Sequence, residues 1–212
     1  MPNITIDKPI SEPLGVDVGV KDLAVVSTGE KYKNINKTKT VKKTNKRLKR
    51  LQRQVSRQYE KIKTKKIKGK GKNLLKLEKQ INKTYQRLTN IRTNYIHQRT
   101  SILVKTKPEY VVIEDLNVKG MMKNRHLSKA IAQQKLYEFR RQLEYKCLWY
   151  GVKLIIADRF YPSSKMCSCC GNIKKDLNLS DRVYKCECGN VMDRDLQAAI
   201  NLREYPKLAK AM

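Results

Sequence analysis

The stretch "LGVDVGVKDLAVVSTGEKYKNI", residues 14–35, decides the fold. From Leu14 to Val20 every second residue is apolar, and a second apolar run covers residues 23–27. The turn residues "TGE" then lead into residues 31–35. Alternation with a period of two, interrupted by turn residues, is typical of neighbouring β-strands. The stretch therefore predicts a three-stranded meander.

Further along the chain, strands and helices are expected to alternate. The runs "PEYVVIEDL" (108–116) and "VKLIIAD" (152–158) read as buried strands. Between them, residues 128–150 have a helical pattern that Ser128 can cap and Gly151 can end. One face of this helix would carry Leu136, Phe139, Leu143 and Cys147, the last as a small core residue, and "DLQAAINLREY" reads as a final helix. This order predicts an α/β protein with a mixed sheet covered by helices.

Positive charge is concentrated in one segment. The formal net charge of the chain is +29, and residues 31–107 hold 27 Lys and Arg but only two acids, Glu60 and Glu78. Such a segment favours a polyanionic partner, and its binding would depend on salt. The alternative is a solvated or disordered run of like charges.

The basic segment nevertheless has helical periodicity. Apolar residues recur every three or four positions from Leu48 to Ile62 and again from Leu74 to Tyr95, on either side of Gly69 and Gly71. Two amphipathic helices that pack as an antiparallel hairpin would explain both halves and leave a basic outer surface. The pattern does not separate a nucleic-acid-binding arm from a spacer.

Five of the six cysteines lie close together. Cys167 and Cys170 form a C-x-x-C-G knuckle, and Cys186 and Cys188 form a tighter one. Four thiolates at such spacing predict a structural zinc site, with Cys169 as an alternative ligand. A redox C-x-x-C would leave the second knuckle unexplained. Neither histidine is near the cysteines in sequence, and both His97 and His126 are expected at the surface.

Three acids are candidates for a second metal site. Asp17 lies in the first strand, Glu114 at the end of the fourth, and Asp195 at the start of the last helix. If the first and fourth strands are adjacent, these carboxylates can converge and would repel one another unless cations lie between them. Two magnesium ions held there could activate a water in phosphodiester cleavage. The alternative is that they are surface or helix-capping carboxylates.

Four motifs in order resemble a known family. "GVDVGVKDLAVVSTGE", "VVIEDLNVKGM", "PSSKMCSCCG" and "CECGNVMDRDLQAAINL" look like the C-terminal half of the TnpB (OrfB-type) transposon proteins, which are RNA-guided DNA nucleases. The resemblance implies an RNase H-like (RuvC-type) domain over residues 14–202. It also implies an inserted basic helical hairpin at 38–107 and a zinc ribbon at 163–192. Residues 1–13 and 203–212 would be tails.

The resemblance also implies roles for individual residues. It makes Asp17, Glu114 and Asp195 the catalytic magnesium ligands, with Asp193 as a neighbour that caps the helix or shapes the site. Arg194 would contact substrate phosphate or pair with an acid, and Asp115 would be structural. Basic residues of the hairpin would bind nucleic acid, namely Lys46, Arg47, Lys49, Arg50, Arg53 and Arg57.

The chain departs from the family in two ways. Gln197 replaces an Asn that is common two residues after the last catalytic Asp, and the family's N-terminal wedge and recognition part is not seen. The main hypothesis is a cytoplasmic, metal-dependent DNA endonuclease domain that works with a transposon-derived guide RNA and a DNA target. A second is a truncated protein that binds nucleic acid without cutting it, as a homo-oligomer or beside a full-length relative. No membrane association is expected, and no nucleophile motif favours a strand-joining recombinase.

Overall fold

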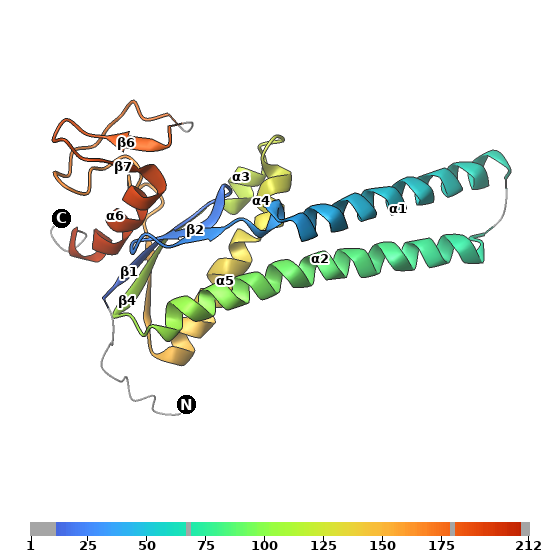
Figure 1. The fold of residues 1–212 in the computed structure, drawn as a ribbon, viewed down its shortest axis with the longest axis horizontal. Coiled ribbons are helices and arrows are strands. Elements are labelled where there is room, and N and C mark those ends of the chain that lie inside the picture. The colour runs from blue at the N-terminus through green and yellow to red at the C-terminus, as the bar shows by residue number, and fades with distance from the viewer. Residues whose placement is uncertain (1–11, 67–68, 179–180, 209–212) are drawn as a thin grey trace. The chain divides into compact units, whose positions relative to one another are not determined.

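A computed structural model describes residues 12–66, 69–178 and 181–208. The chain divides into two compact units, Met1–Asn34 with Ile96–Met212 and the intervening Ile35–Tyr95. The first unit contains the main sheet, and the second is a helical hairpin (Figure 1). The expected tail segments 1–11 and 209–212, and residues 179–180 of the expected zinc ribbon, lie outside the described residues.

The main sheet has five strands in the order β3-β2-β1-β4-β5. They are β1 (Leu14–Val18), β2 (Asp22–Val26), β3 (Lys31–Lys33), β4 (Tyr110–Glu114) and β5 (Lys153–Ala157). Strands β1 to β3 pair antiparallel through short turns, whereas β1, β4 and β5 are parallel and need long crossovers. The expected mixed α/β sheet is therefore confirmed, with the first and fourth strands adjacent.

Helix α6 (Arg194–Leu208) lies directly on one face of the sheet, with no side chain between it and β1 at Gly15. A Cβ at Gly15 would lie 1.9 Å from the carbonyl oxygen of Ala199 and 2.4 Å from the backbone nitrogen of Arg203. Leu202 packs on the same face against Tyr110 and Val112 of the neighbouring strand. The helix starts immediately after β7 (Val191–Asp193), so its first turn is held at the edge of the sheet.

The expected single helix over residues 128–150 is wrong. It is broken into α4 (Ser128–Gln134) and α5 (Leu136–Tyr150) at Lys135, whose backbone is left-handed with φ 54°. The break lets the buried Gln134 amide donate to the carbonyl oxygen of Gly19, 3.1 Å away in the β1–β2 turn. Helix α4 also lacks a side-chain cap from Ser128, but Gly151 ends α5 in the left-handed conformation, as expected.

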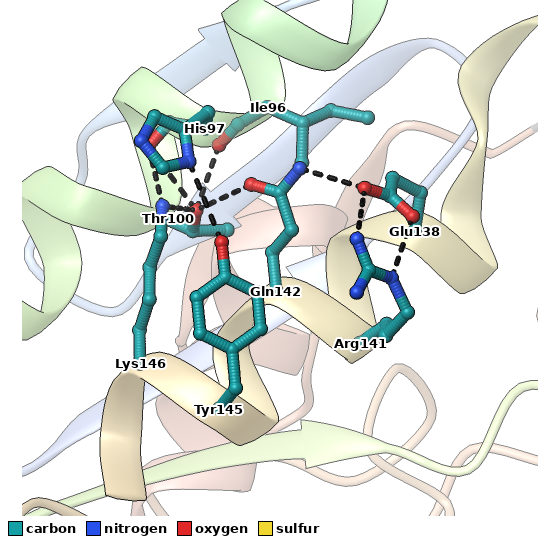
Figure 2. A network of polar contacts seen from close by, with 8 residues as sticks. All are labelled: Ile96, His97, Thr100, Glu138, Arg141, Gln142, Tyr145 and Lys146. Carbon is teal, nitrogen blue, oxygen red and sulfur yellow. Dashed lines mark hydrogen bonds and ion pairs between the residues drawn. The ribbon is translucent and has the colours of Figure 1, made fainter. Parts of the chain in front are cut away.

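A polar network joins α5 to the last turns of α2 (Lys72–Lys105) (Figure 2). The buried Lys146 amine donates to the His97 carbonyl oxygen at 2.6 Å, the Thr100 hydroxyl at 2.6 Å and the Ser101 hydroxyl at 2.9 Å. Burial, with Lys105 nearby, lowers the pKa of Lys146 to about 8. This end of α2 therefore belongs to the sheet unit, and the compact hairpin ends at Tyr95 instead of residue 107.

The hairpin unit consists of α1 (Lys39–Thr64) and the first part of α2, which run side by side (Figure 1). Thr38 caps α1 by accepting from the Val41 nitrogen. Val41, Leu48 and Leu88 form a small core of their own. The apolar stripe predicted from the sequence therefore holds two helices together and leaves their basic residues outward.

Three short elements remain. The 3-10 turn Ile35–Lys37 belongs to the hairpin unit. The short helix α3 (Val118–Met122) and the strand β6 (Val183–Lys185), which pairs antiparallel with β7, belong to the unit that contains the main sheet. Helix α6 continues to Leu208, so residues 203–208 are helical and not part of a tail. Among the described residues, no helix is long and apolar enough to span a membrane.

Candidate metal centres and nucleic-acid surface

The β1–β4 register places the first two candidate carboxylates side by side. Val16 pairs with Ile113 in parallel register. Continuing that register by one residue puts Asp17 opposite Glu114, and aligned residues on adjacent strands point to the same face. Both acids therefore lie at the carboxyl ends of the two central strands.

Helix α6 brings the third carboxylate to this strand end. Asp195 lies in the first turn of α6, one turn before Ala199, which touches Gly15. Asp17 is near enough to both Asp195 and Glu114 for their charges to contribute to its raised pKa. Residues separated by up to 178 positions in the chain are thus gathered around Asp17.

The electrostatics of this carboxylate cluster, Asp17, Glu114 and Asp195, are unfavourable without a counter-charge. Burial, followed by repulsion from Asp195 and Glu114, raises the pKa of Asp17 to about 7. Burial and the neighbouring Asp115 raise the pKa of Glu114. A divalent cation would relieve both effects, because carboxylate oxygens are its preferred ligands.

The sulfur cluster, Cys167, Cys170, Cys186 and Cys188, is more compact than the carboxylate cluster. Its four sulfur atoms all lie within 4.8 Å of one another, and in the described part of the chain this is the only set of three or more His, Cys, Asp or Glu ligands gathered closely enough for one ion. Cys169 is exposed and outside the set. The four thiols could hold a metal ion, and the shorter second knuckle does not prevent the sulfurs from meeting.

Amide side chains tie the sulfur cluster to α6. The Gln197 amide, fully buried, donates to the Met166 carbonyl oxygen at 2.7 Å and accepts from the Asn190 side chain at 3.2 Å. Asn201 donates to the same Met166 oxygen at 2.7 Å. Although burial raises the pKa of Cys167, hydrogen bonds from the Cys170 backbone and the Asn190 amide lower it to about 6. Gln197, the departure from the family pattern, therefore contacts the cysteine loops.

Asp193 caps helix α6. One of its oxygens accepts from the backbone nitrogens of Asp195 at 3.0 Å and Leu196 at 3.2 Å, and the other accepts from Lys31 at 2.8 Å. Burial opposes its ionisation, but these donors lower the pKa of Asp193 overall. The Lys31 contact was not anticipated, since nothing in the sequence relates residues 162 positions apart.

Arg194 has partners within the protein. Its side chain is only 13% exposed, donates to the Asn178 carbonyl oxygen at 2.9 Å and lies 3.8 Å from an Asp195 oxygen. Whether Arg194 also contacts a substrate phosphate stays a prediction. Asp115 is bound by Arg140 at 2.7 Å and Arg159 at 2.5 Å, which suits the structural role expected of it.

The remaining expectations concern single side chains and the basic surface. Cys147 is buried, and its burial raises the pKa of the thiol to about 12, whereas His97 and His126 are exposed. All six hairpin residues proposed to bind nucleic acid are exposed along α1, namely Lys46, Arg47, Lys49, Arg50, Arg53 and Arg57.

Comparison with known proteins places the chain in a family. The OrfB (IS605-type) family model, described as "Probable transposase", matches residues 1–125, more than half of the chain. A second model, described as "Cas12f1-like, TNB domain", matches residues 137–202. The chain belongs to the OrfB family of transposon-associated, TnpB-type proteins, which confirms the resemblance seen in its motifs.

Two curated relatives illustrate the similarity. A candidate RNA-guided DNA endonuclease from Streptomyces pristinaespiralis is 39% identical over 189 residues, which are 89% of this chain and 44% of the relative. The candidate RNA-guided DNA endonuclease InsQ of Escherichia coli K12 is 32% identical over 84% of this chain and 45% of its own length. The chain thus spans a little under half the length of these relatives.

A solved structure supports the fold. The cryo-EM structure of the Cas12f1–sgRNA–target DNA complex aligns with a TM-score of 0.63 at 21% identity, covering 95% of this chain and 52% of the Cas12f1 chain. A CRISPR–Cas12f ternary complex aligns with a TM-score of 0.64 at 22% identity, over 96% of this chain and 40% of that chain. The RNase H-like (RuvC-type) mixed sheet predicted from the sequence is confirmed.

Proposed function

We propose that this chain is the nuclease part of a TnpB-like, RNA-guided DNA endonuclease, and that Asp17, Glu114 and Asp195 hold its catalytic magnesium ions. The carboxylate cluster around Asp17 carries this proposal, because burial, together with repulsion from Asp195 and Glu114, raises the pKa of Asp17 to about 7. The names of the curated relatives point to the same activity.

The chemistry follows from the position of the cluster. Ions bound there would activate a water molecule and stabilise the leaving oxygen during phosphodiester hydrolysis. The chain's own contribution is to fix the three carboxylates on two strand ends and one helix start, where Asp193 anchors that helix to Lys31. The proposed role of the sulfur cluster is to hold a structural zinc ion beside this helix.

Nucleic-acid partners are proposed from charge and from the relatives. The exposed basic row on α1 would bind phosphates, while a guide RNA pairs with the DNA target, as expected for an RNA-guided enzyme. Replacing the six α1 residues by Gln should make single-stranded DNA binding less sensitive to salt. The slope of the logarithm of the binding constant against the logarithm of the salt concentration should become shallower by up to about 4. A comparison variant, with the five exposed α2 residues Lys72, Lys76, Lys79, Lys83 and Arg87 replaced by Gln, tests whether α1 is the preferred surface. Equal losses per replaced residue in the two variants would contradict that preference.

The proposal is tested with Asp17→Ala and Glu114→Ala. Each should abolish magnesium-dependent cleavage of single-stranded DNA while leaving its dissociation constant nearly unchanged, since the basic surface is intact. Glu109→Ala, which removes an exposed acid next to the other end of β4, is the matched control. Persistent cleavage by either variant, in a preparation where Glu109→Ala is active, would disprove the assignment.

A second function is binding of transposon RNA or DNA without cutting it. The exposed Lys and Arg of α1 support it, because a basic surface binds phosphates without any catalytic metal. Purified protein with magnesium and single-stranded DNA, with and without RNA, separates the two functions when a full-length relative serves as the positive control. Binding without cleavage would favour this second function.

A further inference from the structure

We propose that a cavity beside Glu114 is a binding pocket for one nucleotide of the DNA strand, with the base against Tyr137 and the phosphate near Lys119. The proposal deepens the proposed function and rests on it, because it takes single-stranded DNA as the substrate. The cavity has a volume of about 450 Å³, which lies within the range of small-ligand pockets.

The cavity opens at the strand end that carries the carboxylate cluster. Its lining includes Glu114 and also Val18, which directly follows Asp17 on β1. Because neighbouring residues of a strand point to opposite faces, Val18 turns away from the face that Asp17 shares with α6. Glu114, however, belongs to both the carboxylate cluster and the cavity lining, so a DNA strand whose phosphate lies at the carboxylates would place an adjacent nucleotide at the mouth of this cavity.

The inner wall of the cavity is apolar. It is lined by Ile113 of β4 and by Leu136 and Phe139 of α5, all of which are buried. An apolar wall beneath a polar rim suits the face of a nucleobase, which is flat and apolar, while its edges carry hydrogen-bonding groups. Single-stranded nucleic acids are commonly bound through such stacking, without sequence preference.

The rim supplies an aromatic ring and cations. The Tyr137 side chain lines the cavity and is 69% exposed, so its ring is available to a base. Lys119 lies on the rim and is exposed, which suits a phosphate contact. Arg140 and Arg159 also line the cavity, and their shared bonds to Asp115 fix both guanidinium groups in position.

The first test is equilibrium binding of a fluorescein-labelled thymidine oligonucleotide in magnesium-free buffer. Tyr137→Ala should weaken binding about five-fold or more, because one stacked base contributes about 1–3 kcal/mol. Tyr137→Phe keeps the ring and should bind within about two-fold of the unmodified protein. Trp149→Ala is the matched control, since Trp149 is an equally exposed aromatic residue of α5 outside the cavity lining.

The second test locates the base directly. An oligonucleotide carrying 5-iodouracil should photo-crosslink to Tyr137 or its cavity neighbours, as mapped by mass spectrometry of the digested protein. Replacing the central bases by abasic sites should weaken binding to unmodified protein but add nothing to the loss in Tyr137→Ala. Crosslinks confined to other surfaces, or equal losses for Tyr137→Ala and Trp149→Ala, would overturn the pocket.

These measurements also separate the pocket from the proposed function. Neither requires cleavage, so both can be repeated on Asp17→Ala, which should still crosslink at the cavity. If crosslinking persists while Asp17→Ala continues to cut DNA, the pocket stands and the carboxylate assignment fails. If Asp17→Ala stops cutting but no protein crosslinks at Tyr137, the catalytic proposal stands and the pocket fails.

Discussion

The sulfur cluster and the carboxylate cluster are two proposed metal sites built in opposite ways. The four sulfurs come from two short knuckles, and their atoms already lie within 4.8 Å of one another. The carboxylates come from two strands and a helix, and burial with repulsion from the other two raises the pKa of Asp17 to about 7. Ligands that are close in sequence can thus be brought together by short loops. Ligands that come from distant elements are brought together by the folding of the whole unit, even though their charges repel.

The largest expected effect comes from removing a sulfur ligand. Cys167→Ser should abolish stoichiometric zinc binding and destabilise residues 163–192 by roughly 4 kcal/mol or more, because zinc binding energy is folding energy in such modules. Elemental analysis and limited proteolysis measure both effects. Cys169→Ser is the matched control, and it should keep its zinc because Cys169 is outside the sulfur set. A fully zinc-loaded, protease-resistant Cys167→Ser protein would contradict the site.

The next effect concerns how the fold assembles the carboxylates. Gly15→Ala should destabilise the sheet unit by roughly 3 kcal/mol, because the added methyl would lie 1.9 Å from the Ala199 oxygen and push α6 off the sheet. Thermal unfolding followed by circular dichroism measures the loss. Gly19→Ala meets its first neighbour only at 3.6 Å and should behave like the unmodified protein. Equal stability of the two variants would show that α6 does not depend on this contact.

The charge at the centre of the cluster should itself be destabilising. Asp17→Asn should stabilise zinc-loaded protein by about 2 kcal/mol at pH 8 in magnesium-free buffer, because it removes a buried carboxylate that two others repel. Added magnesium should raise the melting temperature of the unmodified protein but not that of Asp17→Asn. Glu109→Gln, at an exposed acid, should change neither value. A destabilised Asp17→Asn in the absence of magnesium would argue against repulsion at this site.

The two clusters are connected through Gln197. Gln197→Ala should destabilise the protein by about 1–2 kcal/mol, because the backbone oxygen of Met166 and the Asn190 amide each lose a buried partner. Urea unfolding measures the change, and the weakened cysteine loops should also release zinc faster to a chelator. Gln98→Ala makes the same deletion at an exposed position and serves as the control. Unchanged zinc release would mean that the loops do not depend on α6.

The smallest effect contrasts Asp17 with a carboxylate that the protein satisfies by itself. Hydrogen bonds from Arg141 lower the pKa of Glu138 to about 2. Burial opposes this shift, and a hydrogen bond from Gln142 adds to it (Figure 2). The ionised Glu138 carboxylate should contribute about 1 kcal/mol to the free energy of unfolding. This contribution should be present above the unfolded pKa near 4.5 and be lost as the pH falls towards 2. The stability difference between the unmodified protein and Glu138→Gln should therefore shrink over this interval.

Urea unfolding at several pH values measures that difference. Both proteins lose zinc to the same extent in acid, so the effect of zinc loss cancels in the difference. Glu144→Gln is the control, since its carboxylate is 48% exposed and pairs with Arg140 on the surface. A difference that stays constant down to pH 2 would contradict the proposed role of Glu138.

Much of this architecture could be predicted from the sequence because its signals are local. Alternation after Leu14 predicts the meander, a run of branched residues before Glu114 predicts the buried strand, and the knuckles predict the sulfur cluster. The hairpin periodicity predicts two helices. The gathering of Asp17 with Asp195 needed the family resemblance, because the 19 acids of the chain offer many other triplets.

Features that depend on distant contacts could not be predicted. The break at Lys135 has no glycine or proline to signal it, and it accompanies a bond from the Gln134 amide to the distant carbonyl of Gly19. The Lys31–Asp193 pair joins the third strand to the last helix across most of the chain. No local sequence signal indicates that the Lys146 amine is buried and donates to the His97 carbonyl and the Thr100 hydroxyl.

The hairpin between Asn34 and Ile96 has its own small core around Leu48 and Leu88. Its inward-facing apolar residues pack between its own two helices. The same number of whole helical turns could therefore be deleted from both helices without exposing new apolar surface. This makes the hairpin a natural place for shortening or lengthening the protein by engineering. Selection could use the same freedom to change the length of the hairpin while the main sheet is left unchanged.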